Sequence, residues 1–146
     1  MKVRELLDKL GQTLTVCHSD DTIQVGAAIL TSRRIGALPV YDESDSLVGI
    51  ISERDIVHAF VHSGCGLQGM RVGEVMSTNV ICCAPDDSLE KARSLLRTHR
   101  IRHLPVVEES MVVGILSIRD LLDSGVEGAR REFSSVQDNV IPAPLN

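Results

Sequence analysis

A serine and an aspartate stand three residues apart at two places in the sequence, as Ser52 with Asp55 and as Ser117 with Asp120. Each pair falls where an apolar run ends and a helical pattern begins, so both side chains can face one ligand from a helix's first turn. A carboxylate accepts two hydrogen bonds from vicinal hydroxyls such as a ribose 2′,3′-diol, and a serine hydroxyl beside free helical N–H groups suits a phosphate. The simpler alternative is helix capping, for which Ser and Asp in a first turn are ordinary.

An internal repeat carries both pairs. Its first two segments recur at one constant spacing, so that Asp20 corresponds to Asp86. The third segment recurs one residue earlier than this spacing, because the second copy has a one-residue deletion. The matching segments are 20–23 (DDTI) and 86–89 (DDSL), 34–40 (RIGALPV) and 100–106 (RIRHLPV), and 49–55 (GIISERD) and 114–120 (GILSIRD). A duplicated unit of roughly 55–60 residues buries too little apolar surface to be very stable alone, so the two copies are expected to pack together.

Each copy is predicted to fold as β-α-β-β-α, which gives an α/β (α+β) fold class. In the second copy, Ser88 is expected to cap a helix, and Pro105 is expected at the start or edge of a strand. The predicted elements are 15–17, 23–33, 38–41, 47–51 and 53–62 in the first copy and 79–84, 89–99, 104–107, 112–116 and 118–122 in the second. Residues 3–10 and 72–76 are expected to form matching lead-in turns.

The repeated motif Arg-Ile-x-x-Leu-Pro-Val, followed by a turn and Gly-h-h-Ser-x-Arg-Asp, resembles the tandem cystathionine-β-synthase (CBS) domain pair, or Bateman module. The resemblance covers about residues 3–123, and 51–57 (ISERDIV) is also similar to small stand-alone bacterial members with no attached enzyme. We therefore expect a pseudo-symmetric pair divided into a first CBS domain over 1–63, a flexible linker over 64–71, a second CBS domain over 72–125 and a partly disordered tail over 126–146.

The resemblance implies a sensor that binds adenosine-containing ligands in clefts between the two copies. The ligands that it implies are AMP, ADP, ATP, NAD and S-adenosylmethionine. Within it, Ser52 with Asp55 and Ser117 with Asp120 are expected to bind nucleotide. It also implies flat homodimers, which the apolar helix surface at Ile56, Val57, Leu121 and Leu122 favours.

Phosphate recognition is expected to differ between the copies. Arg102 and His103 stand where the family often places basic residues facing phosphates, and the first copy has Gly36 and Ala37 there. We therefore expect the second copy to neutralise a phosphate and the first to suit a nucleoside. The arginines adjacent to the aspartates either reach phosphates or are solvated or paired with Asp; they are Arg54 and Arg119.

Adenine needs apolar walls more than aromatic ones. The candidates are Ile35, Ile101, Val16 and Val80, whose alternative role is plain core packing. Asp55, His58 and His62 share one helix face near Cys65 and imitate a metal site, but the glycines around Cys65 and the ribose role of Asp55 argue against a metal. The four cysteines are expected to be reduced structural thiols, since no C-x2-C pair is present.

Composition narrows the function classes further. Only 2% of residues are aromatic and the formal net charge is -5, which disfavours a base-stacking platform and a duplex-DNA binder. The apolar runs are too short for a membrane span, and Met1–Leu10 is too charged for a secretory signal, so we expect a cytoplasmic protein.

The leading hypothesis is a non-enzymatic regulatory module that binds an adenine nucleotide and acts on an unidentified effector protein. The alternative is a structural homodimerisation module whose nucleotide clefts are vestigial. An enzyme ranks third, because no catalytic or metal-binding set stands apart from the binding residues. A DNA-bound regulator ranks fourth, because no helix-turn-helix segment accompanies the repeat.

Overall fold

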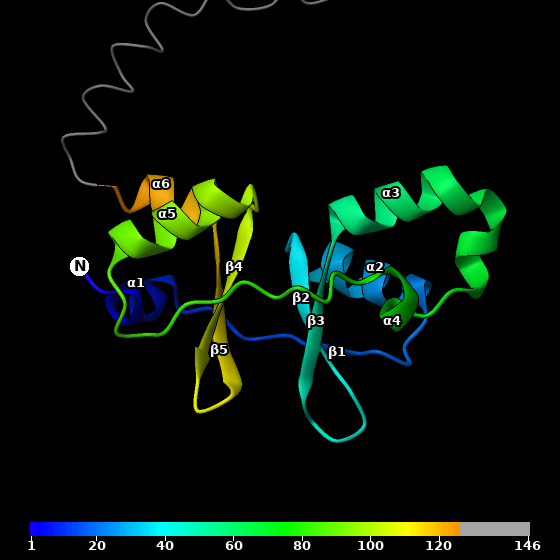
Figure 1. Ribbon diagram of the computed structural model, residues 1–146, viewed down its shortest axis with the longest axis horizontal. Coiled ribbons are helices and arrows are strands. Elements are labelled where there is room, and N and C mark those ends of the chain that lie inside the picture. Colours follow the sequence, from blue (N-terminus) through cyan, green and yellow to red (C-terminus); the bar gives the residue numbers. More distant parts are fainter. Residues whose placement is uncertain (126–146) are drawn as a thin grey trace, which may run out of the picture.

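The two copies of the repeat form two halves that lie side by side (Figure 1). The computed structural model describes residues 1–125. Its elements in chain order are α1 (Val3–Leu10), β1 (Cys17–His18), α2 (Ile23–Arg33), β2 (Ala37–Tyr41), β3 (Leu47–Ser52), α3 (Glu53–Ser63), the 3₁₀ helix η1 (Gly64–Gly69), α4 (Val72–Val75), α5 (Leu89–His99), β4 (His103–Glu108), β5 (Met111–Ser117) and α6 (Ile118–Asp123). The first half holds the sheet β1-β2-β3, and the second holds the antiparallel pair β4-β5. The predicted fold class is confirmed.

Two helices have the residue bounds that the sequence predicts, because both of their ends carry strong signals. The Thr22 side chain accepts the N–H of Val25 at the start of α2, and Ser88 accepts the N–H of Lys91 at the start of α5. Both helices end at an arginine in the left-handed conformation, Arg34 with φ 54° and Arg100 with φ 53°. Arginine at this position is unusual, because the left-handed region favours glycine.

The strand predicted over residues 79–84 is wrong. Only Cys83 pairs there, in a single parallel bridge with Val106, whereas β1 in the first copy pairs along two residues with β2. After β1, the N–H of Ser19 donates to the Tyr41 carbonyl at 2.9 Å and extends the ladder. Pro85 occupies the equivalent place in the second copy, and it has no N–H with which to do the same.

The lead-in segments are exchanged between the halves. Val3 and Leu6 of α1 are buried in the core of the second half, and Val72 of α4 is buried in the core of the first. In Figure 1, α1 accordingly lies with α5 and β5. Both lead-in segments were expected as turns and are α-helices instead, of eight residues in α1 and four in α4.

The segment 64–71, predicted as a flexible connection, contains regular structure. Residues Gly64–Gly69 form the 3₁₀ helix, and the side chains of Leu67 and Met70 pack against the first core. Two apolar side chains therefore attach this glycine-rich stretch to the first core. The prediction for the tail lies outside the described residues.

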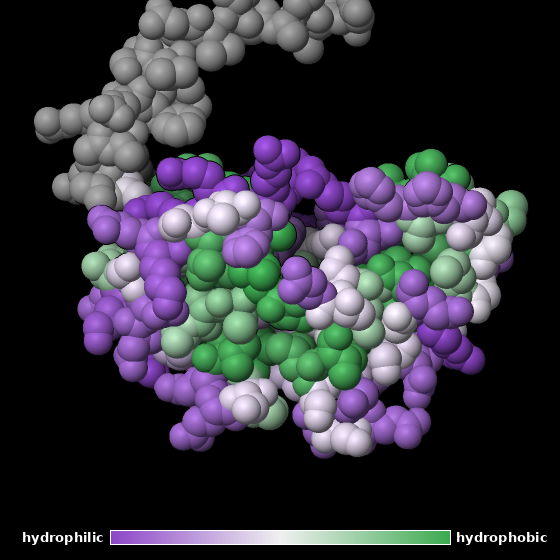
Figure 2. Space-filling model, viewed as in Figure 1, coloured by the Kyte–Doolittle hydropathy of each residue, from purple (hydrophilic) through white to green (hydrophobic). Residues whose placement is uncertain are grey.

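The halves are also joined directly. The N–H of Val112 donates to the hydroxyl of Tyr41 at 3.0 Å, and this bond is buried. Within residues 1–125, no helix is long and apolar enough to cross a membrane. The space-filling view shows apolar side chains gathered over the centre of one face, where the halves meet (Figure 2).

Candidate functional site

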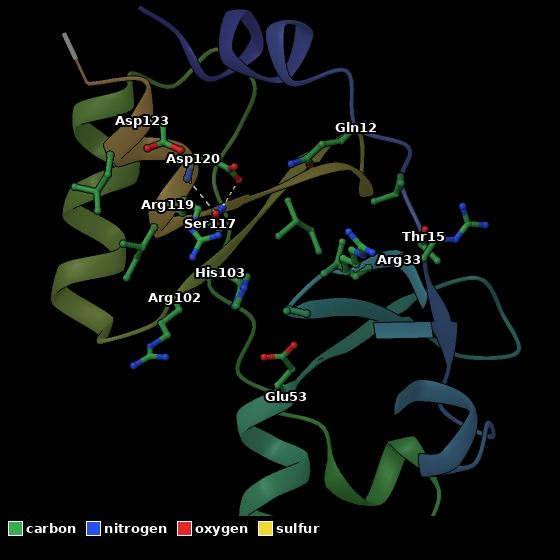
Figure 3. Close-up of a pocket in the computed structure, with 18 of the residues that line it drawn as sticks. Gln12, Thr15, Arg33, Glu53, Arg102, His103, Ser117, Arg119, Asp120 and Asp123 are labelled. Carbon is green, nitrogen blue, oxygen red and sulfur yellow. Dashed lines mark hydrogen bonds between the residues drawn. The ribbon is translucent and has the colours of Figure 1, made fainter. Parts of the chain in front are cut away.

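A cleft of about 1600 Å³ opens between the two halves. The first half contributes the segment before β1, the turn into β2 and the start of α3, and the second contributes the start of β4 and the junction of β5 with α6. The cleft brings together six of the twelve predicted site residues, namely Ile35, Arg102, His103, Ser117, Arg119 and Asp120. Figure 3 shows Asp120 and Arg102 on one side and Glu53 on the other.

Ser117 and Asp120 form a reciprocal capping box at the start of α6. The N–H of Ser117 donates to Oδ2 of Asp120 at 2.8 Å, and the N–H of Asp120 donates to Oγ of Ser117 at 3.1 Å. In the described part of the chain, no group donates to Oδ1 of Asp120. Capping and ligand binding are therefore compatible, because one carboxylate oxygen and the serine hydroxyl proton remain available in the cleft.

Four arginines line the cleft, two more than the sequence analysis selects there. Arg102 and Arg119 come from the second copy, and Arg33 and Arg34 come from the end of α2. Three carboxylates face them, Glu53, Asp120 and Asp123. Within residues 1–125, none of the four arginines forms a salt bridge with a carboxylate. The cleft thus holds four guanidinium groups and three carboxylates, in a chain of net charge -5.

Of these two further arginines, Arg34 had a sequence signal, because it opens the repeated motif Arg-Ile-x-x-Leu-Pro-Val. A helix that ends with Arg33-Arg34 instead of glycine places an arginine in a left-handed conformation that costs roughly 1–2 kcal/mol. Arg100 is the equivalent residue of the second copy and has the same left-handed conformation.

His103 crosses from the second copy to the first. A Cβ atom on Gly36 would lie 2.5 Å from Nε2 of His103, so the imidazole can pack here only because residue 36 has no side chain. Burial lowers the pKa of His103 most strongly; Arg102 adds to this, and Glu53 and Asp120 oppose it. The imidazole is half-buried between charged groups of both signs and is mostly neutral at pH 7.

The first-copy pair is arranged differently. Ser52 and Asp55 form the same capping box, with the N–H of Ser52 2.9 Å from Oδ2 of Asp55. Oγ of Ser52 also donates to Oδ2 at 3.0 Å, and Oγ of Ser77 donates to Oδ1 at 3.1 Å. Neither residue of the pair lines the cleft described above, nor does Arg54. The two predicted ribose sites are therefore not equivalent.

Of the four residues predicted to form the adenine walls, one lines the cleft and three do not. Ile35 lines the cleft and also packs against the first core, so it serves both purposes. Ile101 packs against the second core, and neither it nor Val16 or Val80 lines this cleft. Leu14 and Thr15 line it instead. The constant offset of the repeat makes Leu14 the equivalent of Val80, so consistent use of the repeat would have found Leu14.

All four cysteines are free thiols. Burial raises the pKa of both Cys17 and Cys83 to about 12, so neither forms a thiolate at neutral pH. Cys65 and Cys82 are exposed. Across residues 1–125, no group of three or more His, Cys, Asp or Glu side chains is placed to hold a metal ion.

Comparison with known proteins defines the class. The CBS domain family model matches residues 3–62 and again 72–127. The chain therefore belongs to the CBS domain family and carries two CBS domains. It is 32% identical over 121 residues to the CBS domain-containing protein CBSX3, mitochondrial, of Arabidopsis thaliana, a match that covers 80% of this chain and 59% of that protein.

Solved structures of CBS-domain proteins share the fold. The protein ATU1752 from Agrobacterium tumefaciens matches with a TM-score of 0.79 and 31% identity, covering 88% of this chain and 92% of that one. PAE2072 from Pyrobaculum aerophilum, complexed with AMP, matches with a TM-score of 0.75 and 26% identity, covering 92% and 99%. The CBS pair of MJ0100, in complex with 5′-methylthioadenosine and S-adenosyl-L-methionine, matches with a TM-score of 0.73 and 28% identity, covering 93% and 98%.

Proposed function

We propose that this chain is a non-enzymatic regulatory module that binds an adenosine-containing nucleotide in the cleft around Ser117 and Asp120. The observation that carries the proposal is the Oδ1 of Asp120, which accepts no hydrogen bond from residues 1–125, in a cleft with four arginines that form no salt bridge within the same residues. The adenosine ligands of two structurally similar CBS proteins support it. AMP, ADP, ATP, NAD and S-adenosylmethionine are the candidate ligands.

Each part of such a ligand has a counterpart in the cleft. Oδ1 of Asp120 and the hydroxyl of Ser117 suit the two hydroxyls of a ribose. Leu14, Ile35 and Ile115 offer apolar walls for an adenine. The arginines suit a phosphate, because a guanidinium binds phosphate oxygens in pairs.

A thermal-shift panel of the five candidates and NADH tests the binding, since a ligand that binds only the folded state raises its melting temperature. Asp120→Asn should weaken the best ligand roughly tenfold or more, because a hydrogen bond to a charged group is lost. Arg102→Ala should weaken AMP far more than adenosine. Equal losses for AMP and adenosine would show that Arg102 shapes the fold and does not contact the phosphate, and no shift with any ligand would overturn the proposal.

A homodimer is the second part of the proposal, and the surface of α3 supports it. Val57, Phe60 and Val61 lie on one face of this helix with 61%, 60% and 75% of their surface exposed. Leu122 of α6 is also exposed, whereas Leu121, expected beside it, is buried in the second core. Figure 1 places α3 and α6 along the same edge of the molecule.

Light scattering at tens of micromolar (roughly, a concentration that a specific interface survives) tests the dimer. Val61→Asp should yield monomers, and Val113→Asp on β5 is the matched control. If ligands never bind but the dimer forms, the chain is a structural homodimerisation module with vestigial clefts. A cytoplasmic location, an effector protein as partner, and independence from nucleic acid and membrane complete the proposal.

A further inference from the structure

Asp55 in the first copy has both carboxylate oxygens satisfied by the protein itself. Oδ2 accepts the N–H and the Oγ of Ser52 at 2.9 and 3.0 Å. Oδ1 accepts the hydroxyl of Ser77 at 3.1 Å, from a residue 22 positions later in the chain. Because Oδ2 of Asp55 already accepts two bonds, a ribose there would have to compete with Ser77 for Oδ1, whereas the corresponding oxygen of Asp120 has no donor within residues 1–125.

The backbone holds Ser77 in this place. After α4 the chain runs beside the outer edge of β3, where the N–H of Ile50 donates to the Ser77 carbonyl at 3.0 Å and the N–H of Ser77 donates to the Ile50 carbonyl at 2.9 Å. Gly49 permits this approach, because a Cβ there would lie 2.5 Å from Sδ of Met76 and 2.8 Å from the Ser77 carbonyl oxygen.

The second copy has no equivalent of the Ser77 bridge within the described residues. Ile50 stands opposite Pro39, and Ile115 stands opposite Pro105, so both isoleucines direct their backbone groups outward from the strand pair. At Ile115, however, α1 continues as a helix to Leu10 and the chain then turns at Gly11, so this lead-in segment forms no bridge like that of Ser77. Ile115 lines the cleft instead.

We infer that the Ser77 hydroxyl occupies the ribose position of the first copy, so that each chain takes one adenosine ligand, at Asp120. The inference rests on the proposed function. It makes the length of the lead-in helix the feature that decides which of two equal Ser-x-x-Asp motifs binds. A ligand could enter at Asp55 only after displacing Ser77.

Calorimetric titration of the full chain with AMP tests the inference. Wild type should bind one AMP per chain, and Asp55→Asn should leave both affinity and stoichiometry unchanged. Two sites in the wild type, or one binding event lost in Asp55→Asn, would overturn the inference while leaving the proposed function intact. Absence of any binding by AMP, NAD or S-adenosylmethionine would instead overturn the proposed function.

Variants at residue 77 test the hydroxyl itself. Ser77→Ala frees Oδ1 of Asp55 and should add a second event, weaker than the first by roughly tenfold or more because the bridging backbone still crowds this site. Ser77→Thr retains the hydroxyl and should keep one site, and Thr78→Ala is the neighbouring control. If Ser77→Ala still binds one AMP, the hydroxyl is not the occupant, and the inference is wrong.

Discussion

The two Ser-x-x-Asp motifs are nearly identical in local geometry and different in what surrounds them. The capping bond measures 2.9 Å in the first copy and 2.8 Å in the second. Ser77 approaches Asp55 from 22 residues away, and four arginines and a half-buried histidine surround the cleft of Asp120. A repeated motif therefore fixes the position of a carboxylate, and contacts from distant segments decide whether that carboxylate is available to a ligand.

The largest effect is expected from breaking one core at a time. Leu38 and Leu104 are equivalent residues with 0% of their surface exposed, and replacing either by Ala should lower the free energy of unfolding by about 2–5 kcal/mol. Because α1 packs in the second core, Leu104→Ala should reduce amide protection in α1 more than in α4, and Leu38→Ala should do the reverse. Hydrogen exchange on both variants measures this. If Leu104→Ala instead reduced protection more in α4, and Leu38→Ala more in α1, the exchanged packing of the lead-in helices would be wrong.

The next comparison uses two equivalent glycines. A Cβ on Gly49 would lie 2.8 Å from the backbone carbonyl oxygen of Ser77, whereas the three atoms nearest a Cβ on Gly114 all belong to the Leu7 side chain, with Cδ2 at 2.7 Å. A side chain can move more easily than a bridged backbone, so Gly49→Ala should cost about 1–3 kcal/mol and Gly114→Ala less than about 1 kcal/mol. Urea titrations of the two variants give the difference. Equal costs would mean that the Ser77 segment yields as readily as a leucine side chain.

These differences mark what the sequence could and could not predict. Helix α5 was predictable to the residue, because its start and its apolar spacing are both local signals. The strand expected over 79–84 was not, because pairing depends on a neighbour, and Pro85 removes the N–H that would extend it. The apolar run alone could not show this.

The candidate site divides along the same line. The repeat alone identifies Ser117 as the equivalent of Ser52. It also aligns Arg102 and His103 with Gly36 and Ala37. The contact of Ser77 with Asp55 joins residues that the repeat does not relate, because the two lead-in helices differ in length. Only the three-dimensional arrangement reveals it.

A smaller effect separates the two left-handed arginines. Arg34→Gly and Arg100→Gly should each raise the free energy of unfolding by about 0.5–1 kcal/mol, because glycine relieves the positive φ at some cost in unfolded-chain entropy. Of the two, Arg34 alone lines the cleft. Arg34→Gly should therefore weaken AMP by roughly three- to tenfold and leave adenosine unchanged, as charged hydrogen bonds predict. Parallel titrations of both variants check this, and equal AMP affinities would remove Arg34 from the phosphate site.

The smallest effect concerns pH and His103. Burial first, and then Arg102, lower the pKa of this imidazole in the folded chain, while Glu53 and Asp120 oppose them. Between that lowered pKa and the ordinary value of 6.5, the unfolded chain binds a proton that the folded chain does not. The contribution of His103 to the free energy of unfolding is therefore fully present above 6.5 and declines as pH falls through this interval.

A bound phosphate should raise the lowered pKa of His103 part of the way back, because its negative charge favours the protonated imidazole. AMP should accordingly bind up to about fivefold more tightly as pH falls below the ordinary value of about 6.5, the range expected of a partly exposed ion pair. AMP's own phosphate also gains a proton near pH 6, so His103→Gln, titrated in the same buffers, supplies the correction. Calorimetry in two buffers of different ionisation enthalpy should show proton uptake in the wild type beyond that in the variant. If the uptake is equal, His103 only fills the space above Gly36, and the cationic character of the second copy rests on its arginines.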